Sequence, residues 1–240
     1  VVVWTGDKYE LYVGPRSTEA LSQATPATIA RMRFTDGIDY ETPWLVSAIP
    51  ITTPLTPGTW PTYVMNPDAA TERWRRMQDV SPGAIRVRAP IFPQNSTTSQ
   101  KYSLVFDNHV SAWQRALDDD AKDGAVFLED DMVLMTGWRG WLAAILKDPT
   151  IHIVRFDETP WTITTDDAST SHSLLVHDTI HPFVSGGYYM SYEAIRKAVT
   201  YARALSATTE KDIECTFWQF IKKHYKHGTR TTTPRLGFQN

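Results

Sequence analysis

The chain is poor in several features that define large classes of proteins. It has one cysteine, Cys215, in 240 residues, which excludes an internal disulfide and is compatible with a reducing compartment. No apolar stretch approaches the roughly 18 residues of a membrane-spanning helix. No signal-peptide pattern is visible either. We therefore expect no transmembrane segment and a cytoplasmic location.

The chain also lacks an excess of charge of either sign. It has 24 Lys and Arg against 27 Asp and Glu, which gives a formal net charge of −3. Proteins that bind nucleic acids usually show a basic excess or a clustered basic face. We therefore expect no nucleic-acid partner.

Several short motifs with known chemistry are missing. Neither Gly-x-Gly-x-x-Gly nor Gly-x-x-x-x-Gly-Lys-Ser/Thr occurs, which argues against a dinucleotide enzyme and a P-loop NTPase. The absence of His-Glu-x-x-His and of paired cysteines argues against a zinc site. No Gly-x-Ser-x-Gly turn of the serine hydrolases is present.

The most informative stretch is an apolar run at 125–128 that leads directly into Glu129, Asp130 and Asp131. Such a run is typical of a strand buried on both faces, and ligands of open α/β sheets bind beyond the carboxyl ends of the strands. Three adjacent carboxylates repel one another unless a cation or solvent offsets their charge. Alternation along a strand places Glu129 and Asp131 on one face, and paired oxygen ligands suit Mg²⁺ or Mn²⁺. The alternative is an acidic turn that merely ends the strand.

Residues 1–58 differ in pattern from the rest of the chain. The apolar segments 1–4 and 9–13 flank turn residues, which predicts a hairpin. Residues 50–58 contain three prolines and cannot continue a central strand or a helix. We expect a small β-rich N-terminal extension over residues 1–58, followed by a second domain over residues 59–240.

The second domain alternates between two hydrophobic patterns. The predicted strands cover 62–65, 84–89, 125–128 and 151–156. The predicted helices cover 69–80, a segment capped by Asn108 or Ser111 that continues to about 120, 138–145, a segment after the N-cap Ser191, and about 210–225. Residues 90–100 are a predicted loop, and residues 157–181 are a predicted loop with short strands. This alternation predicts an α/β fold with a mixed, mostly parallel sheet flanked by helices.

Five stretches, in order, carry a resemblance to a known family. They are 63–66 with 72–77, 86–90, 109–113, 127–131 and 185–191. Together they resemble glycosyltransferases of the GT-A fold, and most of all those of family 25, the lipopolysaccharide-biosynthesis and collagen galactosyltransferase-like type. The Glu-Asp-Asp at 129–131 looks like that family's version of the metal-binding Asp-x-Asp. The resemblance covers about residues 60–225, and Asn66-Pro67 stands where the family usually has Asn-Leu.

The resemblance implies a Rossmann-like GT-A fold and a glycosyltransferase that uses Mn²⁺ or Mg²⁺. Such an enzyme moves a hexose or pentose from a nucleotide-sugar donor to a hydroxyl of a glycan or glycoconjugate acceptor, here by inversion. Asp131 would be the direct metal ligand, and Glu129 or Asp130 would contact the ribose or a metal-bound water. A further metal ligand near the C-terminus would be His227, with His224 as the runner-up.

Further candidate residues each have a structural alternative. Arg73 would contact the donor nucleotide together with Asn66, or would be an exposed helix charge. An inverting transfer needs a general base. Asp212 is our candidate for it, although an acid at the start of a helix also serves as a cap.

The acceptor side is predicted from Gly186, Gly187 and Tyr188. Glycines permit a close approach of the backbone to a sugar, or else form a tight strand entry. Tyr188 would stack on a sugar ring, or belong to the core. Two other functions remain as alternatives: a metal-dependent nucleotidyl or phosphoryl transferase, and a non-enzymatic carbohydrate-binding module.

Overall fold

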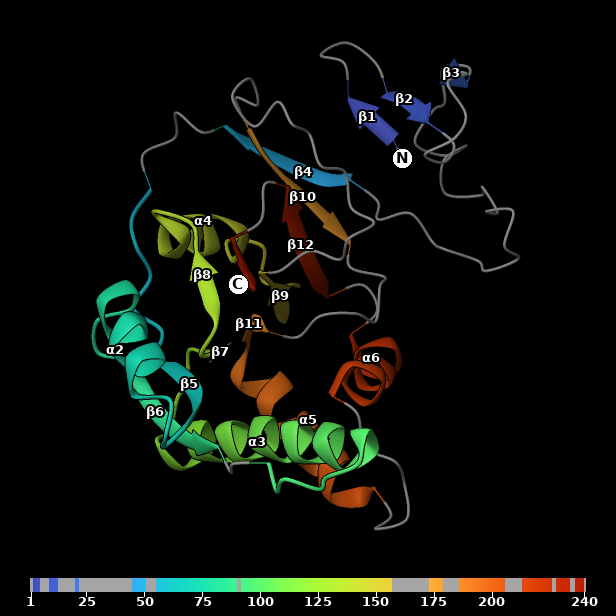
Figure 1. Cartoon of the computed structure of the whole chain (residues 1–240). Helices are drawn as coiled ribbons and strands as arrows, with labels where there is room; N and C mark the ends of the chain where they lie inside the picture. Colours follow the sequence, from blue (N-terminus) through green and yellow to red (C-terminus); the bar gives the residue numbers. More distant parts are fainter. Residues whose placement is uncertain are drawn as a thin grey trace.

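Figure 1 shows the fold of the chain, a computed structural model. The structure describes residues 2–4, 9–12, 20–21, 45–50, 55–89, 92–156, 173–178, 186–205, 213–225, 228–233 and 236–239. Among these residues, no helix is both long enough and apolar enough to cross a membrane.

One large sheet organises the described part of the chain. Its strands are β4 (Leu45–Pro50), β5 (Thr62–Pro67), β6 (Ile85–Ala89), β7 (Ala125–Glu129), β9 (Ile153–Arg155), β10 (Ser173–Asp178), β11 (Gly187–Met190) and β12 (Thr229–Thr233). They lie in the order β4-β10-β12-β9-β11-β7-β5-β6. Strands β10 and β11 run against the other six. The predicted α/β class and the mixed, mostly parallel sheet are therefore confirmed.

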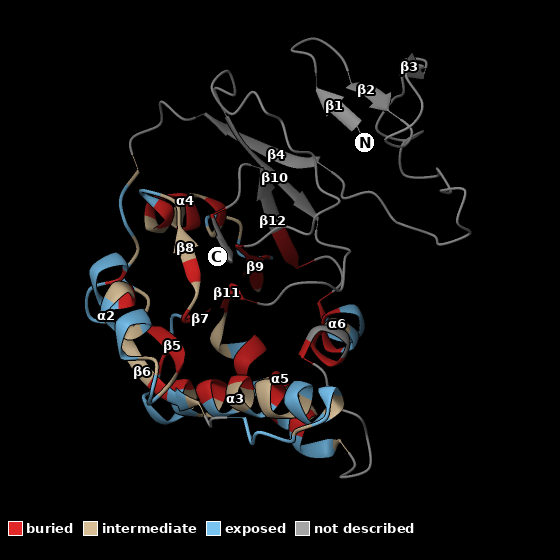
Figure 2. Cartoon of the chain, viewed as in Figure 1, coloured by how far each residue is buried: buried red, intermediate tan, exposed pale blue. Residues whose placement is uncertain are grey.

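Helices cover both faces of this sheet because alternate strand residues point to opposite sides. Tyr63 and Phe127 belong to a core shared with α3 (Thr98–Asp118), α5 (Tyr192–Ala204) and α6 (Ile213–His224). Val64 and Val126 belong to a second core with α2 (Thr71–Val80) and α4 (Trp138–Ile145). Figure 2 shows the buried positions on the helix sides that face the sheet.

The N-terminal hairpin is confirmed, because β1 (Val2–Trp4) pairs antiparallel with β2 (Tyr9–Tyr12). Strand β3 (Ala20–Leu21) extends it to a three-stranded sheet. In contrast, β4 pairs with β10 in the large sheet, although it lies within residues 1–58. Pro50 ends β4, an edge strand, where a missing backbone donor is tolerated. The domain boundary at residue 58 stays a prediction.

The start of α3 corrects the sequence analysis, which placed the helix at Asn108 or Ser111 and a loop up to residue 100. The helix begins at Thr98 because Thr97 and Gln100 form a capping box. The Thr97 hydroxyl accepts a hydrogen bond from the Gln100 backbone N–H at 3.2 Å, and Gln100 Oε1 accepts one from the Thr97 N–H at 2.8 Å. These bonds satisfy backbone donors at the first turn.

The C-terminal tail was not predicted to form strands, but it forms two. Strand β12 inserts between β9 and β10, and β13 (Gly237–Gln239) pairs antiparallel with β8 (Met132–Leu134). The sequence of β12 is Thr-Arg-Thr-Thr-Thr, which has no apolar alternation. Its β-branched threonines nevertheless favour extended backbone.

Candidate active site at the acidic turn

The candidate site lies where β5, β6 and β7 end. These strands are parallel neighbours, so their carboxyl ends share one edge of the sheet. Asn66 is near the end of β5, and Glu129 is the last residue of β7. Asp130 and Asp131 form a turn into β8, named here the acidic turn. Because the strand stops at Glu129, the expected alternation of the three carboxylates does not extend through Asp130 and Asp131.

Asp130 is held by three polar side chains from elsewhere in the chain. Its Oδ2 accepts a hydrogen bond from Asn66 Nδ2 and lies 3.1 Å from Arg73 Nε. Its backbone carbonyl accepts a hydrogen bond from Arg76 Nη2 at 3.3 Å. Asp130 is only 6% exposed. The structure thus brings together Asn66, Arg73 and Asp130, the three residues predicted to bind the donor.

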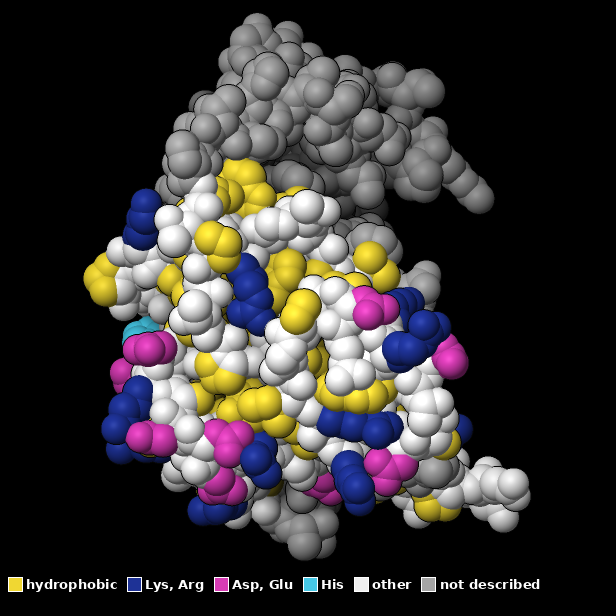
Figure 3. Space-filling model, turned by 90° about the vertical axis from the view of Figure 1, so that its left-hand side faces the viewer, with side chains coloured by type: hydrophobic (Ala, Val, Ile, Leu, Met, Phe, Trp, Pro, Cys, Tyr) yellow, Lys and Arg dark blue, Asp and Glu magenta, His cyan; other side chains and the backbone are white. Residues whose placement is uncertain are grey.

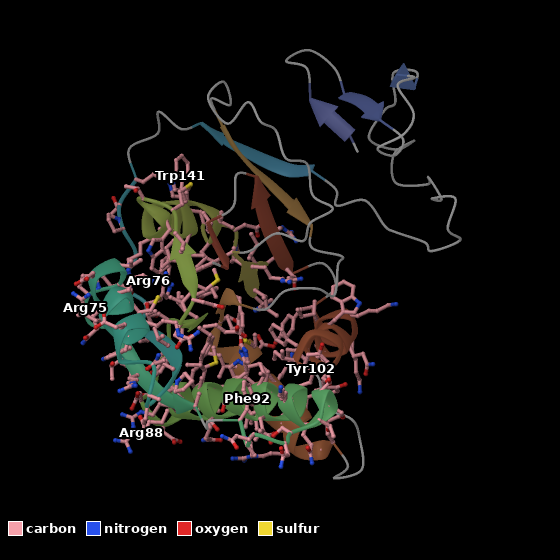
Figure 4. All side chains as sticks on the ribbon, in the orientation of Figure 1. Arg75, Arg76, Arg88, Phe92, Tyr102 and Trp141 are labelled. Carbon is pink, nitrogen blue, oxygen red and sulfur yellow. The ribbon has the colours of Figure 1, made fainter. Side chains whose placement is uncertain are left out.

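The two arginines reach the turn because they lie three positions apart on one side of α2. The intervening Arg75 bonds instead to Glu72 at 2.9 Å on the exposed side of the helix. Figure 4 shows Arg75 on the outer side of α2 and Arg76 on the side of the sheet. The sequence analysis did not assign Arg76 to the site, although its spacing from Arg73 was a usable signal.

Glu129 is held by a residue that the sequence analysis left without a role. His109 Nε2 lies 3.2 Å from Glu129 Oε1, and His109 Nδ1 lies 2.6 Å from the Tyr188 hydroxyl. Trp113 Nε1 donates to the same hydroxyl at 2.9 Å. His109 comes from the middle of α3 and is fully buried. A histidine inside a long helix gave no sequence signal for this contact.

The electrostatics of the turn disfavour its negative charge. Burial raises the pKa of Asp131, and the charges of Glu129 and Asp130 raise it further. Burial also raises the pKa of Asp130, while the hydrogen bond from Asn66 and the charge of Arg73 oppose that rise. Oδ1 of Asp131 and Oδ1 of Asn66 are both buried and have no hydrogen-bond partner. Buried acceptors without partners are costly, so these two oxygens point to a ligand that supplies positive charge or a donor.

The residues fit a hard divalent cation in chemistry. Mg²⁺ and Mn²⁺ prefer carboxylate and carbonyl oxygens. The end of β7 and the acidic turn offer Glu129 and Asp131, with an unpartnered oxygen on Asp131. Within the described ranges, no group of three or more His, Cys, Asp or Glu side chains is gathered in one place for a metal. His227, the predicted third ligand, lies outside the described residues.

The three residues that were expected to bind the acceptor contact other parts of the protein. Gly186 O accepts a hydrogen bond from the Glu129 backbone N–H at 2.6 Å, so Gly186 does lie beside the acidic residues. A Cβ at Gly187 would lie 2.6 Å from Met132 Cε and 3.2 Å from Leu128 Cδ2, so these side chains would have to shift to admit one. Tyr188 is 1% exposed and its hydroxyl bonds to His109 and Trp113. Its burial does not support the expected stacking on an acceptor sugar, because the ring offers no free surface.

Of the remaining candidates for the general base and the further metal ligand, the structure describes only His224. Asp212, the predicted general base, lies outside the described residues, as does His227. His224, the alternative metal ligand, lies at the exposed end of α6 and packs on Phe220 and Tyr201 with ring centroids 5.2 and 6.3 Å apart. These contacts place His224 with the core that α5 and α6 share.

Comparisons with known proteins give little beyond this geometry. No protein-family model matches the chain, and no curated protein matches it. One similar solved structure is a crystal structure of a glycosyltransferase involved in the glycosylation of the major capsid of PBCV-1. It has a TM-score of 0.43 and 12% sequence identity, and the match covers 70% of this chain and 80% of that one. A TM-score below 0.5 is too low to support an argument about function.

The surface around α2 carries charges of both signs. Figure 3 shows Lys and Arg side chains interspersed with Asp and Glu on the described part of this face. Two of the ion pairs there join Arg86 and Arg88 to Asp68, with N–O distances of 3.9 and 3.6 Å. The arginines near the acidic turn are therefore not part of a larger basic patch on the described part of this face.

Proposed function

We propose that the chain is a metal-dependent glycosyltransferase. It moves a sugar from a nucleotide-sugar donor to a hydroxyl of a glycan or glycoconjugate. The observation that carries the proposal is the convergence of acidic and basic side chains at one edge of the sheet. Arg73 and Arg76 both contact Asp130, which lies between Glu129 and Asp131, beyond the carboxyl ends of β5 and β7. The GT-A resemblance of residues 60–225 supports the same assignment.

This arrangement suits a ligand with a diphosphate. A divalent cation held by Asp131, with Glu129 and His227, would offset negative charge on the departing nucleoside diphosphate. Arg73 is half exposed, with 49% of its side chain accessible, so it can contact a ligand without leaving Asp130. Asn66 is fully buried, so in this proposal it serves the donor site indirectly, by holding Asp130 in contact with Arg73.

The transfer itself requires a nucleophile and a base. The acceptor hydroxyl attacks the anomeric carbon, and the bond from that carbon to the diphosphate oxygen breaks. The hydroxyl proton passes to a carboxylate, for which we propose Asp212. The product of this single displacement is inverted at the anomeric carbon. We propose that the acceptor approaches beside Gly186, because the Gly186 carbonyl accepts a hydrogen bond from the backbone N–H of Glu129.

Calorimetry with a panel of nucleoside diphosphates and nucleotide sugars, with and without Mn²⁺, tests the proposal. We expect at least one nucleoside diphosphate to bind in a Mn²⁺-dependent manner. Asp131→Ala should weaken this binding at least tenfold. Asp79→Ala, which removes an exposed acid of α2, is the matched control and should bind normally. Absence of binding by every compound overturns the proposal.

Product analysis separates the alternatives. Incubation of the bound nucleotide sugar with glycan acceptors should release a nucleoside diphosphate. Release of a sugar 1-phosphate would instead indicate nucleotidyl transfer, and release of a nucleoside monophosphate would indicate transfer of the sugar together with its phosphate. Glycan binding that needs neither nucleotide nor Mn²⁺ would indicate a carbohydrate-binding module.

A further inference from the structure

A buried chain of hydrogen bonds connects the acidic residues to the core of the protein. It runs from Trp113 through the Tyr188 hydroxyl and the His109 ring to Glu129. Three of its members are almost inaccessible, with exposed fractions of 2% for Trp113, 1% for Tyr188 and 0% for His109. The side chain of Glu129 alone remains partly accessible, at 27%. The chain of hydrogen bonds therefore begins in the core and ends at the candidate site.

The donors and acceptors of this chain agree with one tautomer of His109. Trp113 Nε1 can only donate, so the Tyr188 oxygen accepts from it. The Tyr188 O–H then donates to His109 Nδ1, which leaves the proton of a neutral imidazole on Nε2. That N–H points at Glu129 Oε1, 3.2 Å away. In this arrangement every donor in the chain of hydrogen bonds has an acceptor, as buried polar groups require.

The geometry also fixes the position of the ring. The His109 and Tyr188 rings are stacked, with centroids 5.7 Å apart and an angle of 19° between their planes. Tyr188 in turn packs against Phe127 of β7 and Phe217 of α6, with centroids 5.5 and 5.0 Å apart. The His109 ring is thus held by its stacking on Tyr188, which itself packs against Phe127 and Phe217.

We propose that His109 is a positioning residue, which orients the Glu129 carboxylate for the cation and nucleotide through its Nε2–H. This role rests on the proposed function of the acidic turn. A free carboxylate at the end of a strand samples several rotamers, and ordering it on binding costs free energy. His109 removes that cost by holding Oε1, and the Glu129 side chain remains 27% accessible at the candidate site.

Three variants separate this role from a contribution to packing alone. His109→Gln places an amide N–H near the position of Nε2 and keeps a donor for Glu129. His109→Leu fills much of the volume but has no donor. Glu129→Gln removes the negative charge that His109 would orient. Each variant is compared with the wild type in Mn²⁺ affinity by calorimetry, and in thermal unfolding to establish that it is folded.

The expected results differ between the two substitutions of His109. His109→Leu should weaken Mn²⁺ affinity about tenfold, whereas His109→Gln should stay within about threefold of the wild type. In the Glu129→Gln background, His109→Leu should have no further effect, because residues that act through one contact are not additive. Additive effects, or unchanged affinity in a folded His109→Leu protein, would overturn the role. Absence of Mn²⁺ binding by the wild type would overturn the proposed function together with it.

The tautomer gives a second test that needs no metal. Nitrogen-15 NMR of the histidine side chains distinguishes a ring protonated on Nε2 from one protonated on Nδ1. We expect His109 of the metal-free protein to carry a proton on Nε2, with a signal identified by its loss in His109→Gln. Protonation on Nδ1 alone would overturn the proposal, since Nε2 would then have no proton to donate to Glu129.

Discussion

Asn66 and Asp130 are 64 positions apart in the sequence, yet Asn66 Nδ2 donates a hydrogen bond to Asp130 Oδ2. The same amide nitrogen donates to the carbonyl of Ala70 at 3.1 Å, just before α2. One fully buried amide therefore joins the end of β5, the start of α2 and the acidic turn. Because Arg73 of α2 also reaches Asp130, the turn and the helix are fixed to each other.

Substitution of Asn66 tests this connection. Asn66→Ala should lower the free energy of unfolding by about 1–3 kcal/mol, because it leaves a buried carboxylate without its amide donor. Chemical denaturation of Asn66→Ala, Asp130→Ala and the double variant measures the effect. The double variant should lose less than the sum of the two single losses. A sum equal to the double loss would contradict a direct interaction.

Asp131 gives a prediction of the opposite sign. Its pKa is raised by burial and by the charges of Glu129 and Asp130, so its ionised form is disfavoured in the folded protein at neutral pH. Asp131→Asn should therefore raise the Tm at pH 7 in the presence of EDTA, by about 2 °C or more. The gain should shrink at lower pH, where the wild-type carboxyl takes up a proton.

Scanning calorimetry of Asp131→Asn also reports on the ligand. Mn²⁺ should raise the Tm of the wild type, because a ligand that binds only the folded state stabilises it, and should leave Asp131→Asn nearly unchanged. Asp79→Asn, at an exposed position of α2, is the control and should behave as the wild type in both conditions. A lower Tm for Asp131→Asn in EDTA would contradict the inferred repulsion.

Much of the fold could be predicted from local patterns. Strands β5, β6 and β7 follow from short apolar or alternating runs, and the end of β7 at Glu129 follows from the change to consecutive carboxylates. The cap of α5 could be read from Ser191, whose hydroxyl accepts from the Ala194 N–H at 3.3 Å. In each case the signal and the structure that it predicts lie within a few residues of each other.

The contacts that build the site could not be predicted in the same way. The bond from His109 to Glu129 and the bond from Asn66 to Asp130 depend on how α3 and β5 are placed against β7. No local pattern records that placement. Strand β12 could not be predicted from a local pattern either, because its polar residues become part of a sheet only by pairing with β9 and β10.

The ion pair between Arg115 and Asp119 gives a pH-dependent prediction. The hydrogen bond from Arg115 lowers the pKa of Asp119, and the hydrogen bond from Tyr63 lowers it further, against the opposing effect of burial. A lowered pKa stabilises the folded protein above the ordinary carboxyl value of about 4, and the contribution is lost as the pH falls through the lowered value. Asp119→Asn should thus be less stable than the wild type at pH 7.

The comparison is made by thermal unfolding between pH 7 and pH 3. The difference in Tm between wild type and Asp119→Asn should be small, since the carboxylate is partly exposed at 30% and exposed pairs are weak. It should become smaller still below pH 4. Asp118→Asn, one residue earlier and also exposed, should show a smaller difference at pH 7. A difference that grows on acidification would contradict the stated sign.

The capping box at the start of α3 gives the last prediction. Thr97→Ala removes the hydroxyl that accepts from the Gln100 N–H, so it should lower the free energy of unfolding by about 0.5–2 kcal/mol. Thr98→Ala is a matched control, because Thr98 is the first residue of the helix and is exposed. Alanine favours helix more than threonine does, so Thr98→Ala should be neutral or slightly stabilising. Equal losses from both variants in urea denaturation would place the start of the helix elsewhere, and the capping role of Thr97 would be wrong.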